Sequence, residues 1–167
     1  MIETYIQYSN GGKIDVYTLV EKTASDFENI IACCKYFAEQ GAHAIIYPRF
    51  VDTIGNPMYE KMFASLIGTQ YWGKCPDFTI NGMWYEHEGY DTKKDLSDPQ
   101  KRADTFSWMM RRGVKQSDRI IVEDCKVGRR WAKKVIYNRV HFEKQNIKTV
   151  YIRTSDGLEL LYKKEAG

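Results

Sequence analysis

Three carboxylates flank an Asn-Gly dipeptide at a spacing that a hairpin would bring together. Asp77 precedes Asn81-Gly82, and Glu86 and Glu88 follow it. Asn-Gly favours a tight type I′ turn, in which both central residues take positive φ. Side chains alternate between the two faces of a strand, so this register points all three carboxylates the same way. Opposed like charges cost up to about 1 kcal/mol, and a divalent metal, a Lys or Arg partner or a raised pKa must compensate them.

The chemistry that suits this trio is metal-assisted attack on a phosphate. Carboxylate oxygens are the ligands that Mg²⁺ and Mn²⁺ prefer, and such an ion orients water and offsets the charge of a scissile phosphate. Lys74, at the start of the hairpin, and Gln116, in a later loop, could position the phosphate or the water. The alternative is a hairpin face whose carboxylates pair with neighbouring Arg and Lys side chains. The candidate catalytic residues are Asp77, Glu86, Glu88, Lys74 and Gln116, and the three acids are the candidate metal ligands.

The two-residue turn also fixes where the other hairpin side chains lie. It pairs Phe78 with Tyr85, Thr79 with Trp84 and Ile80 with Met83, and it puts Trp84 on the carboxylate face. His87 falls on the opposite face. Histidine titrates near neutrality and suits acid–base work, but a single histidine at a strand end is more often structural.

A second set of residues suits the backbone of a nucleic acid. In the segment 128–144, which has helical periodicity, basic and aromatic side chains recur on one face at a spacing of three and four. Cations would contact phosphates, and a ring could stack on a base. The commoner alternative is that Arg and Lys simply cover a surface helix. The candidate nucleic-acid-binding residues are Arg130, Lys134, Tyr137 and His141, extended by Arg111, Arg112 and Lys115 and widened by Arg129 and Lys133. The face expected to pack inward holds Trp131, Val135, Asn138 and Phe142, with Ala132 and Ile136 beside it.

Composition limits the class of protein. The 167 residues carry a net charge of +3, but residues 1–100 contribute −6 and residues 101–167 contribute +9. A basic C-terminal part beside an acidic cluster indicates a polyanionic partner. No apolar run is long enough to span a membrane and no signal pattern opens the chain, so no membrane partner is expected. Four cysteines without zinc-ligand spacing suggest reduced thiols and a cytoplasmic location.

The periodicity along the chain predicts an α+β fold, a mostly antiparallel sheet with helices packed on it. We expect one domain, 1–167, in which 1–55 could be an N-terminal extension and 56–167 the core. A capping box at Ser25-Asp26-Phe27-Glu28 is expected to open the first long helix, and Asp98 with Pro99 to open the third. Expected strands are 3–8, 14–20, 43–47, 119–123, 147–153 and 158–163 besides the central hairpin, and expected helices are 25–40, 58–66, 98–112 and 128–144.

The hairpin resembles a known nuclease motif. Lys74, Pro76-Asp77, Ile80, Gly82 and Glu86 are similar to the K-x-P-D-x-x-I-x-G-x-x-x-E/D pattern of the tRNase toxin domain of contact-dependent growth-inhibition proteins. The segment 115–121 is similar to that family's later helix-to-strand segment, so the resemblance covers roughly 70–163. It implies a small α+β ribonuclease of the barnase–EndoU–colicin–RelE-like group, acting on RNA without a metal. The strings GKCPDF and EHEG also resemble uncharacterised Bacteroidetes proteins.

The same hairpin resembles the core of metal-dependent PD-(D/E)xK nucleases. In that pattern Asp77 and Glu86 would bind Mg²⁺, and the position of Glu88 would be lysine. The acid in the lysine position points either to altered metal binding or to an inactive nucleic-acid- or protein-binding module. The sequence therefore predicts a toxin-like nuclease domain, with RNA as the favoured partner, a possible neutralising protein, and either no cofactor or Mg²⁺.

Overall fold

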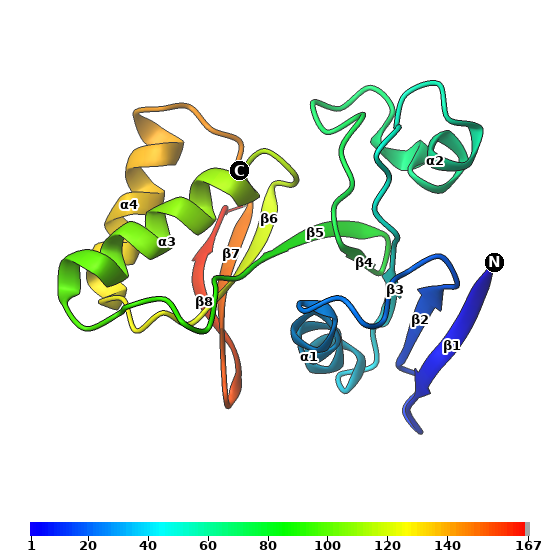
Figure 1. Cartoon of the computed structure of the whole chain (residues 1–167), viewed down its shortest axis with the longest axis horizontal. Helices are drawn as coiled ribbons and strands as arrows, with labels where there is room; N and C mark the ends of the chain where they lie inside the picture. The colour runs from blue at the N-terminus through cyan, green and yellow to red at the C-terminus, as the bar shows by residue number, and fades with distance from the viewer. Residues whose placement is uncertain (166–167) are drawn as a thin grey trace. The chain divides into compact units, whose positions relative to one another are not determined.

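The computed structural model describes residues 1–165, which form an α+β fold (Figure 1). Adjacent strands pair in chain order, and antiparallel pairings are the majority, with parallel pairings at β2–β3, β5–β6 and β6–β7. The predicted fold class is confirmed. The strands are β1 (Ile2–Gln7), β2 (Lys13–Tyr17), β3 (His43–Ile46), β4 (Phe78–Ile80), β5 (Met83–Glu88), β6 (Arg119–Glu123), β7 (Thr149–Thr154) and β8 (Gly157–Lys163). The helices are α1 (Phe27–Ala38), α2 (Pro57–Met62), α3 (Pro99–Gly113), α4 (Arg129–His141) and a short 3-10 turn, η1 (Ala64–Leu66).

The chain divides into two compact units, and the boundary lies inside β5. The first unit runs from Met1 to Tyr85 and the second begins at Glu86. The sequence predicted one domain, 1–167, in which 1–55 could be an N-terminal extension that ends at residue 55. That position falls in the loop before α2, within the first unit. Each unit therefore takes part of β5.

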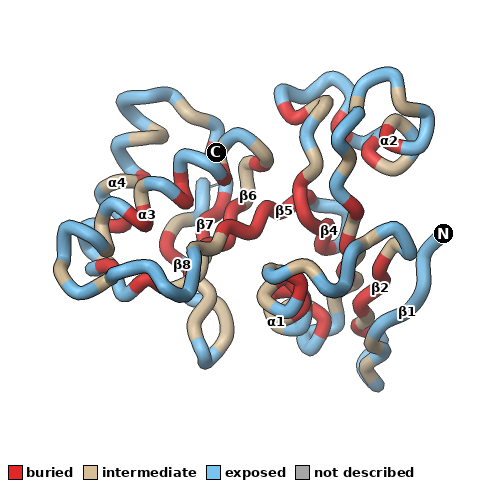
Figure 2. Tube along the Cα trace, in the orientation of Figure 1, coloured by how far each residue is buried: buried red, intermediate tan, exposed pale blue. Residues whose placement is uncertain are grey.

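The first unit is built on a strand–helix–strand crossover. α1 connects the parallel strands β2 and β3 and buries its apolar stripe, which includes Phe27, Ile30 and Ile31, while the inner strand residues Ile14 and Ile46 are also buried (Figure 2). A parallel pair needs such a crossover, because a tight turn can only join antiparallel strands. The ends of β3 and β4 are thereby held beside one another, in antiparallel register.

An aromatic cluster closes the other side of the first unit. Tyr59 and Phe63 stack with ring centroids 4.7 Å apart, and Phe63 stacks on Trp84 at 5.1 Å. The indole N–H of Trp84 donates to the hydroxyl of Ser65 at 2.8 Å. Trp84 is therefore a core residue that satisfies its one donor, and its place on the carboxylate face has a packing explanation.

The second unit repeats the crossover design. α3 connects β5 to the parallel strand β6, α4 connects β6 to the parallel strand β7, and β8 returns antiparallel. As predicted, Asp98 caps α3, accepting from the backbone N–H of Lys101 at 2.9 Å, and Pro99 follows at the first helical position. The core lies between the two helices and the strands and includes Phe106, Met109, Met110, Ile120, Val122, Ile136, Val150 and Ile152.

Two features of the helices depart from expectation. The capping box before α1 does not form, because Asp26 is the N-cap and makes no side-chain capping bond. Its carboxylate is engaged by Arg49 instead. α4 ends at His141, shorter than the predicted 128–144. No helix within residues 1–165 has the length and apolar character that crossing a bilayer demands, and the four cysteines, Cys33, Cys34, Cys75 and Cys125, are free thiols.

Candidate functional site

The predicted hairpin is confirmed in turn and register. Asn81 and Gly82 take φ values of 48° and 82°, as a type I′ turn requires. β4 and β5 pair Ile80 with Met83, Thr79 with Trp84 and Phe78 with Tyr85. Asp77 belongs to the first unit, and Glu86 and Glu88 belong to the second.

Asp77 is buried and bound to an arginine that the sequence reading missed. Its side chain is 3% exposed, and its Oδ1 accepts from Nη2 of Arg49 at 3.1 Å. The same nitrogen donates to the carboxylate of Asp26. Burial lowers the pKa of Arg49, but the charges of Asp77 and Asp26 outweigh burial and the net pKa is raised. The three residues form a carboxylate–guanidinium–carboxylate bridge, which we call the Arg49 bridge.

The sheet explains how these three residues meet. Arg49 follows Pro48 just beyond the end of β3, and Asp77 stands just before β4. Because β3 and β4 are antiparallel neighbours, these positions lie side by side, and the N–H of Tyr47 donates to the carbonyl of Asp77 at 3.0 Å. Asp26 lies at the N-terminus of α1, as its N-cap residue. In the sequence, the signal for this contact was the Pro48-Arg49 pair directly after a buried strand. Identifying Asp77 as the partner of Arg49 also requires the strand order, which the local sequence does not give.

The Arg49 bridge lines a cavity of about 180 Å³ in the first unit. Its polar lining holds the carboxylates of Glu21, Asp26 and Asp77 against the guanidinium of Arg49, an excess of negative charge when all are ionised. The remaining wall is mainly apolar, formed by Leu19, Val20, Ala24, Phe27, Ile30, Ile46, Tyr47 and Pro48. The cavity can hold a small group in contact with both charged and apolar side chains.

The other two candidate carboxylates lie in the second unit. Glu86 and Glu88 are both buried, and Oε2 of Glu88 accepts from Nε of Arg112 at 3.2 Å. Arg112 also lies over the ring of Trp108, with its guanidinium carbon 5.0 Å from the centroid. Asp77 and Glu88 are therefore compensated by guanidinium groups, as the non-catalytic alternative predicts.

Lys74 and Gln116 are placed by their loops. Lys74 is exposed in the first unit, and its carbonyl accepts from the hydroxyl of Tyr59 at 2.5 Å. Gln116 is half-buried just after α3 in the second unit, and its backbone N–H donates to the carbonyl of Gly113 at 3.0 Å. Lys74 and Gln116 remain candidate catalytic residues.

A histidine-centred network lies in the second unit. His87 is buried, with its Nε2 2.8 Å from Oε2 of Glu123. Arg153 binds the same carboxylate through two nitrogens, each at 2.6 Å. Burial raises the pKa of Glu123, but the bonds from His87 and Arg153 outweigh it and the net pKa lies below the ordinary value. The network ties β5, β6 and β7 together.

The predicted nucleic-acid face of α4 is exposed. Arg130, Lys134, Tyr137 and His141 all face solvent, as does the neighbouring Lys133. The rings of Tyr137 and His141 lie 4.1 Å apart. The helix thus presents cations and rings on one surface, which we call the α4 face.

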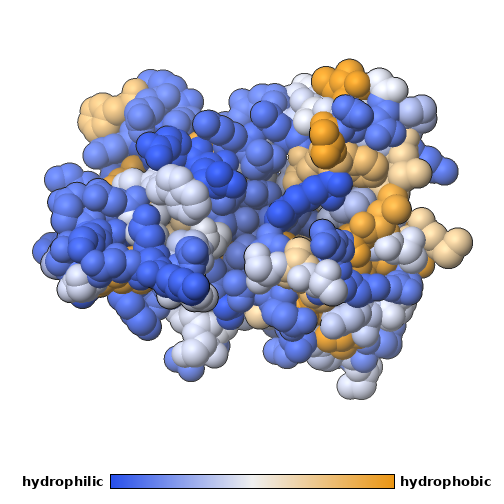
Figure 3. Space-filling model, viewed as in Figure 1, coloured by the Kyte–Doolittle hydropathy of each residue, from blue (hydrophilic) through white to orange (hydrophobic). Residues whose placement is uncertain are grey.

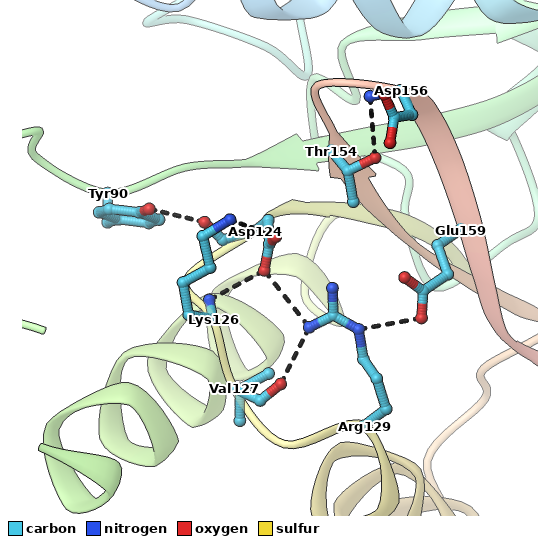
Figure 4. Close-up of polar contacts among 8 residues, drawn as sticks. All are labelled: Tyr90, Asp124, Lys126, Val127, Arg129, Thr154, Asp156 and Glu159. Atoms are coloured by element: carbon cyan, nitrogen blue, oxygen red, sulfur yellow. Dashed lines mark hydrogen bonds and ion pairs between the residues drawn. The ribbon is translucent and has the colours of Figure 1, made fainter.

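Arg129 has a different role from the nucleic-acid contact that the sequence predicted for it. Its guanidinium donates to Glu159 at 2.9 Å, to the carbonyl of Val127 at 2.9 Å and to Asp124 at 3.3 Å, and Tyr90 donates to the carbonyl of Asp124 at 2.7 Å (Figure 4). This network fixes the N-terminus of α4. Arg129 is therefore a positioning residue, and Arg130 is the first exposed cation of the α4 face.

The inward face of α4 was predicted only in part. Ala132 and Ile136 are the buried residues, whereas Trp131 is 39% exposed and Phe142 is 73% exposed. Val135 is partly buried against the same core. The Trp131 ring contacts Phe106 of α3 edge-on, with centroids 6.1 Å apart, and Phe142 lies just past the last residue of α4. Their exposure leaves aromatic surface next to the cations.

The end of α3 carries the remaining predicted cations. Arg111, Arg112 and Lys115 are exposed, although Arg112 is partly committed to Glu88. The visible surface over α3 is largely hydrophilic, whereas hydrophobic side chains break the visible surface of the first unit (Figure 3).

Comparison of the chain with protein-family models, curated proteins and solved structures gives no match.

Proposed function

We propose that this chain is a nuclease-like protein that acts on RNA, with tRNA the favoured substrate in the cytoplasm, and that the second unit binds the RNA through the α4 face. The observation that carries the proposal is the joint exposure of Arg130, Lys134, Tyr137 and His141 on one helix. Cations that neutralise phosphates release condensed counterions, and this release drives binding. Aromatic rings beside them add base stacking.

The charge distribution supports a polyanionic ligand for the second unit. Residues 101–167 hold a net charge of +9, and residues 1–100 hold −6. Arg129 and Arg139 of α4 use their guanidinium groups in contacts within the second unit, whereas Arg130, Lys133 and Lys134 are exposed and available to a partner. A surface of this kind attracts RNA at low salt and loses it at high salt.

The Arg49 bridge is the candidate centre for cleavage. In metal-independent RNA cleavage the 2′-oxygen replaces the 5′-oxygen on phosphorus, the 2′-hydroxyl loses a proton and the leaving 5′-oxygen gains one. A carboxylate such as Asp26, 29% exposed, suits the first proton transfer, and Arg49, 60% exposed, suits the charge that develops on the phosphoryl oxygens. Asp77 then holds Arg49 in position.

Cleavage of labelled tRNA and of total RNA, with and without Mg²⁺ and EDTA, tests the nuclease proposal. The expected result is cleavage that resists EDTA and is abolished by Asp26→Asn. Arg49→Lys is expected to retain partial activity, because one cation replaces another. EDTA-sensitive cleavage of DNA would instead support the metal-dependent restriction-type alternative.

One observation favours a second candidate function, a binding module without turnover. Asp77 and Glu88 are each neutralised by an arginine, at 3.1 Å and 3.2 Å, and Glu88 stands where the restriction-type pattern has lysine. A module of this kind would bind RNA with steep salt dependence and leave it intact under every metal condition. Such a result would remove the cleavage proposal and keep the binding one.

A further inference from the structure

We infer that the C-terminal end of α4 stacks on unpaired bases, so that the chain recognises single-stranded RNA segments such as loops. This inference rests on the proposed function and specifies its substrate class. The residues concerned are Tyr137, His141 and Phe142, which we call the aromatic end of α4.

The three rings form one exposed cluster. Tyr137 is 52% exposed and Phe142 is 73% exposed, values that are high for large rings. The Tyr137 ring lies 4.1 Å from the His141 ring and 6.2 Å from the Phe142 ring, edge-on to the latter at 70°. A single exposed ring is common on a protein surface, whereas several exposed rings in contact form an apolar patch that is typical of a binding site.

The surroundings of the cluster select the occupant. Lys133 and Lys134 lie one turn before Tyr137, and Lys144 follows Phe142; all three are exposed. An acidic residue, Glu143, is also exposed there, but cations predominate. Rings bordered by cations are complementary to a ligand that carries aromatic faces and negative charge together, which a nucleic acid does.

The helix dipole makes the two ends of the α4 face electrostatically different. Arg130 stands near the N-terminus of α4, where the helix dipole is positive, and the aromatic end stands where it is negative. Phosphates are therefore favoured towards Arg130, and uncharged bases are favoured at the other end.

An unpaired base can offer a face to these rings, whereas the internal bases of a duplex cannot. In an A-form duplex the bases are stacked on both sides, and recognition depends on backbone and shape. A single strand or loop can splay a base out onto an exposed ring. The geometry of the aromatic end thus favours single-stranded RNA over duplex RNA.

The test compares a fluorescently labelled single-stranded oligouridylate with a long, fully paired RNA duplex that has no loop. Affinities are measured by fluorescence anisotropy at fixed low salt for the wild type and for the double variant Tyr137→Leu/Phe142→Leu. The control is Tyr137→Phe/Phe142→Tyr, which keeps two rings. Thermal unfolding of each variant establishes that it is folded.

The leucine variant is expected to bind the single strand roughly tenfold more weakly or worse, since stacking on a ring contributes strongly to single-strand affinity. Its binding to the paired duplex is expected to change less than about twofold, because phosphate contacts remain. The control variant should bind the single strand like the wild type.

Equal losses for both RNAs, or no loss for either, would overturn the inference while leaving RNA binding by the α4 face intact. If the wild type binds neither RNA in a salt-dependent manner, the proposed function itself fails and the inference falls with it. If only the paired duplex loses affinity, the rings contact paired RNA and the assignment is wrong.

Discussion

Nη2 of Arg49 lies 3.1 Å from Oδ1 of Asp77. Because Arg49 follows β3 and Asp77 precedes β4, this contact joins the two strand ends within the first unit. The carboxylate is 3% exposed, while the guanidinium is 60% exposed and also holds Asp26. A buried carboxylate is stable only with such a partner. The pair therefore has a structural role whether or not it is catalytic.

Arg49→Met is expected to destabilise the protein by about 1–3 kcal/mol, because it leaves Asp77 charged, buried and without its guanidinium. The exposure of Arg49 keeps the cost below that of a fully buried pair. Urea unfolding of Arg49→Met, of Asp77→Asn and of the double variant measures the coupling. The double variant should be more stable than the sum of the single losses implies; strictly additive losses would show that the contact contributes nothing.

The Glu123 network predicts a pH dependence of stability. The folded-state pKa of Glu123 is lowered from its ordinary value of 4.5. Above that value Glu123 is ionised in both states and its stabilising contribution is fully present. The contribution is lost as pH falls through the lower, folded pKa, where folding no longer excludes the proton.

Urea midpoints measured between about pH 6 and pH 3 test this dependence. The wild type should lose stability more steeply than Glu123→Gln over the acid part of that range. Glu123→Gln should already be less stable at neutral pH, because its amide cannot pair with the charge of Arg153. Parallel profiles for the two proteins would rule out the network as a source of acid sensitivity.

Tyr59 links α2 to the loop before the hairpin. Its hydroxyl donates to the carbonyl of Lys74 at 2.5 Å and accepts from the N–H of Gly73 at 2.8 Å. Tyr59→Phe keeps the ring stack but leaves two backbone groups without this partner, at an expected cost of about 1–3 kcal/mol. Tyr137→Phe, at an exposed position, is the control and should change thermal stability little. Equal small effects would contradict the structural role given to the hydroxyl.

Two neighbouring glycines between β1 and β2 should respond very differently to alanine. A Cβ on Gly12 would lie 1.8 Å from the carbonyl oxygen of Ala38, at the end of α1, so the loop would have to move. Gly11 has φ of +93° with open space around it, and alanine there should cost only about 1–2 kcal/mol of backbone strain.

Expression and thermal unfolding of Gly11→Ala and Gly12→Ala provide the measurement. Gly12→Ala is expected to be strongly destabilised or insoluble, and Gly11→Ala to stay folded with a modest fall in Tm. If both variants unfold at the same temperature, the loop does not dock on α1 as described.

The sequence predicted elements where a local signal was sufficient. Asn81-Gly82 fixed the turn and register of the hairpin, and Asp98-Pro99 fixed the start of α3. Each signal acts within a few residues, through positive φ or a capping bond. The exposed side chains of α4 followed from helical spacing in the same way.

What the sequence could not predict depends on contacts between distant segments. Asp26 looked like part of a capping box, but Arg49, 23 residues away, takes its carboxylate. On α4, Ala132 and Ile136 are buried while Trp131 and Phe142 stay partly exposed, against the simple rule that the largest apolar residues point inward. The Trp131 ring lies edge-on to Phe106 of α3, a contact between helices that no local pattern encodes.

The most direct test of the account is the salt dependence of RNA binding by the full chain, with and without the cations of the α4 face. The variant is Arg130→Gln/Lys133→Gln/Lys134→Gln, and the matched control is Lys61→Gln/Lys93→Gln/Lys94→Gln, which removes equal charge from exposed positions outside α4. Affinities for a single-stranded RNA are measured from about 50 to 200 mM salt.

The account predicts that the wild type and the control lose affinity steeply and in parallel as salt rises. The α4 variant should bind more weakly at every salt concentration and with a clearly shallower slope, by roughly 0.7 for each phosphate contact removed. Equal salt-dependence slopes for the α4 variant and the control, or an affinity that does not change with salt concentration, would contradict the assignment of the α4 face as the surface that binds RNA.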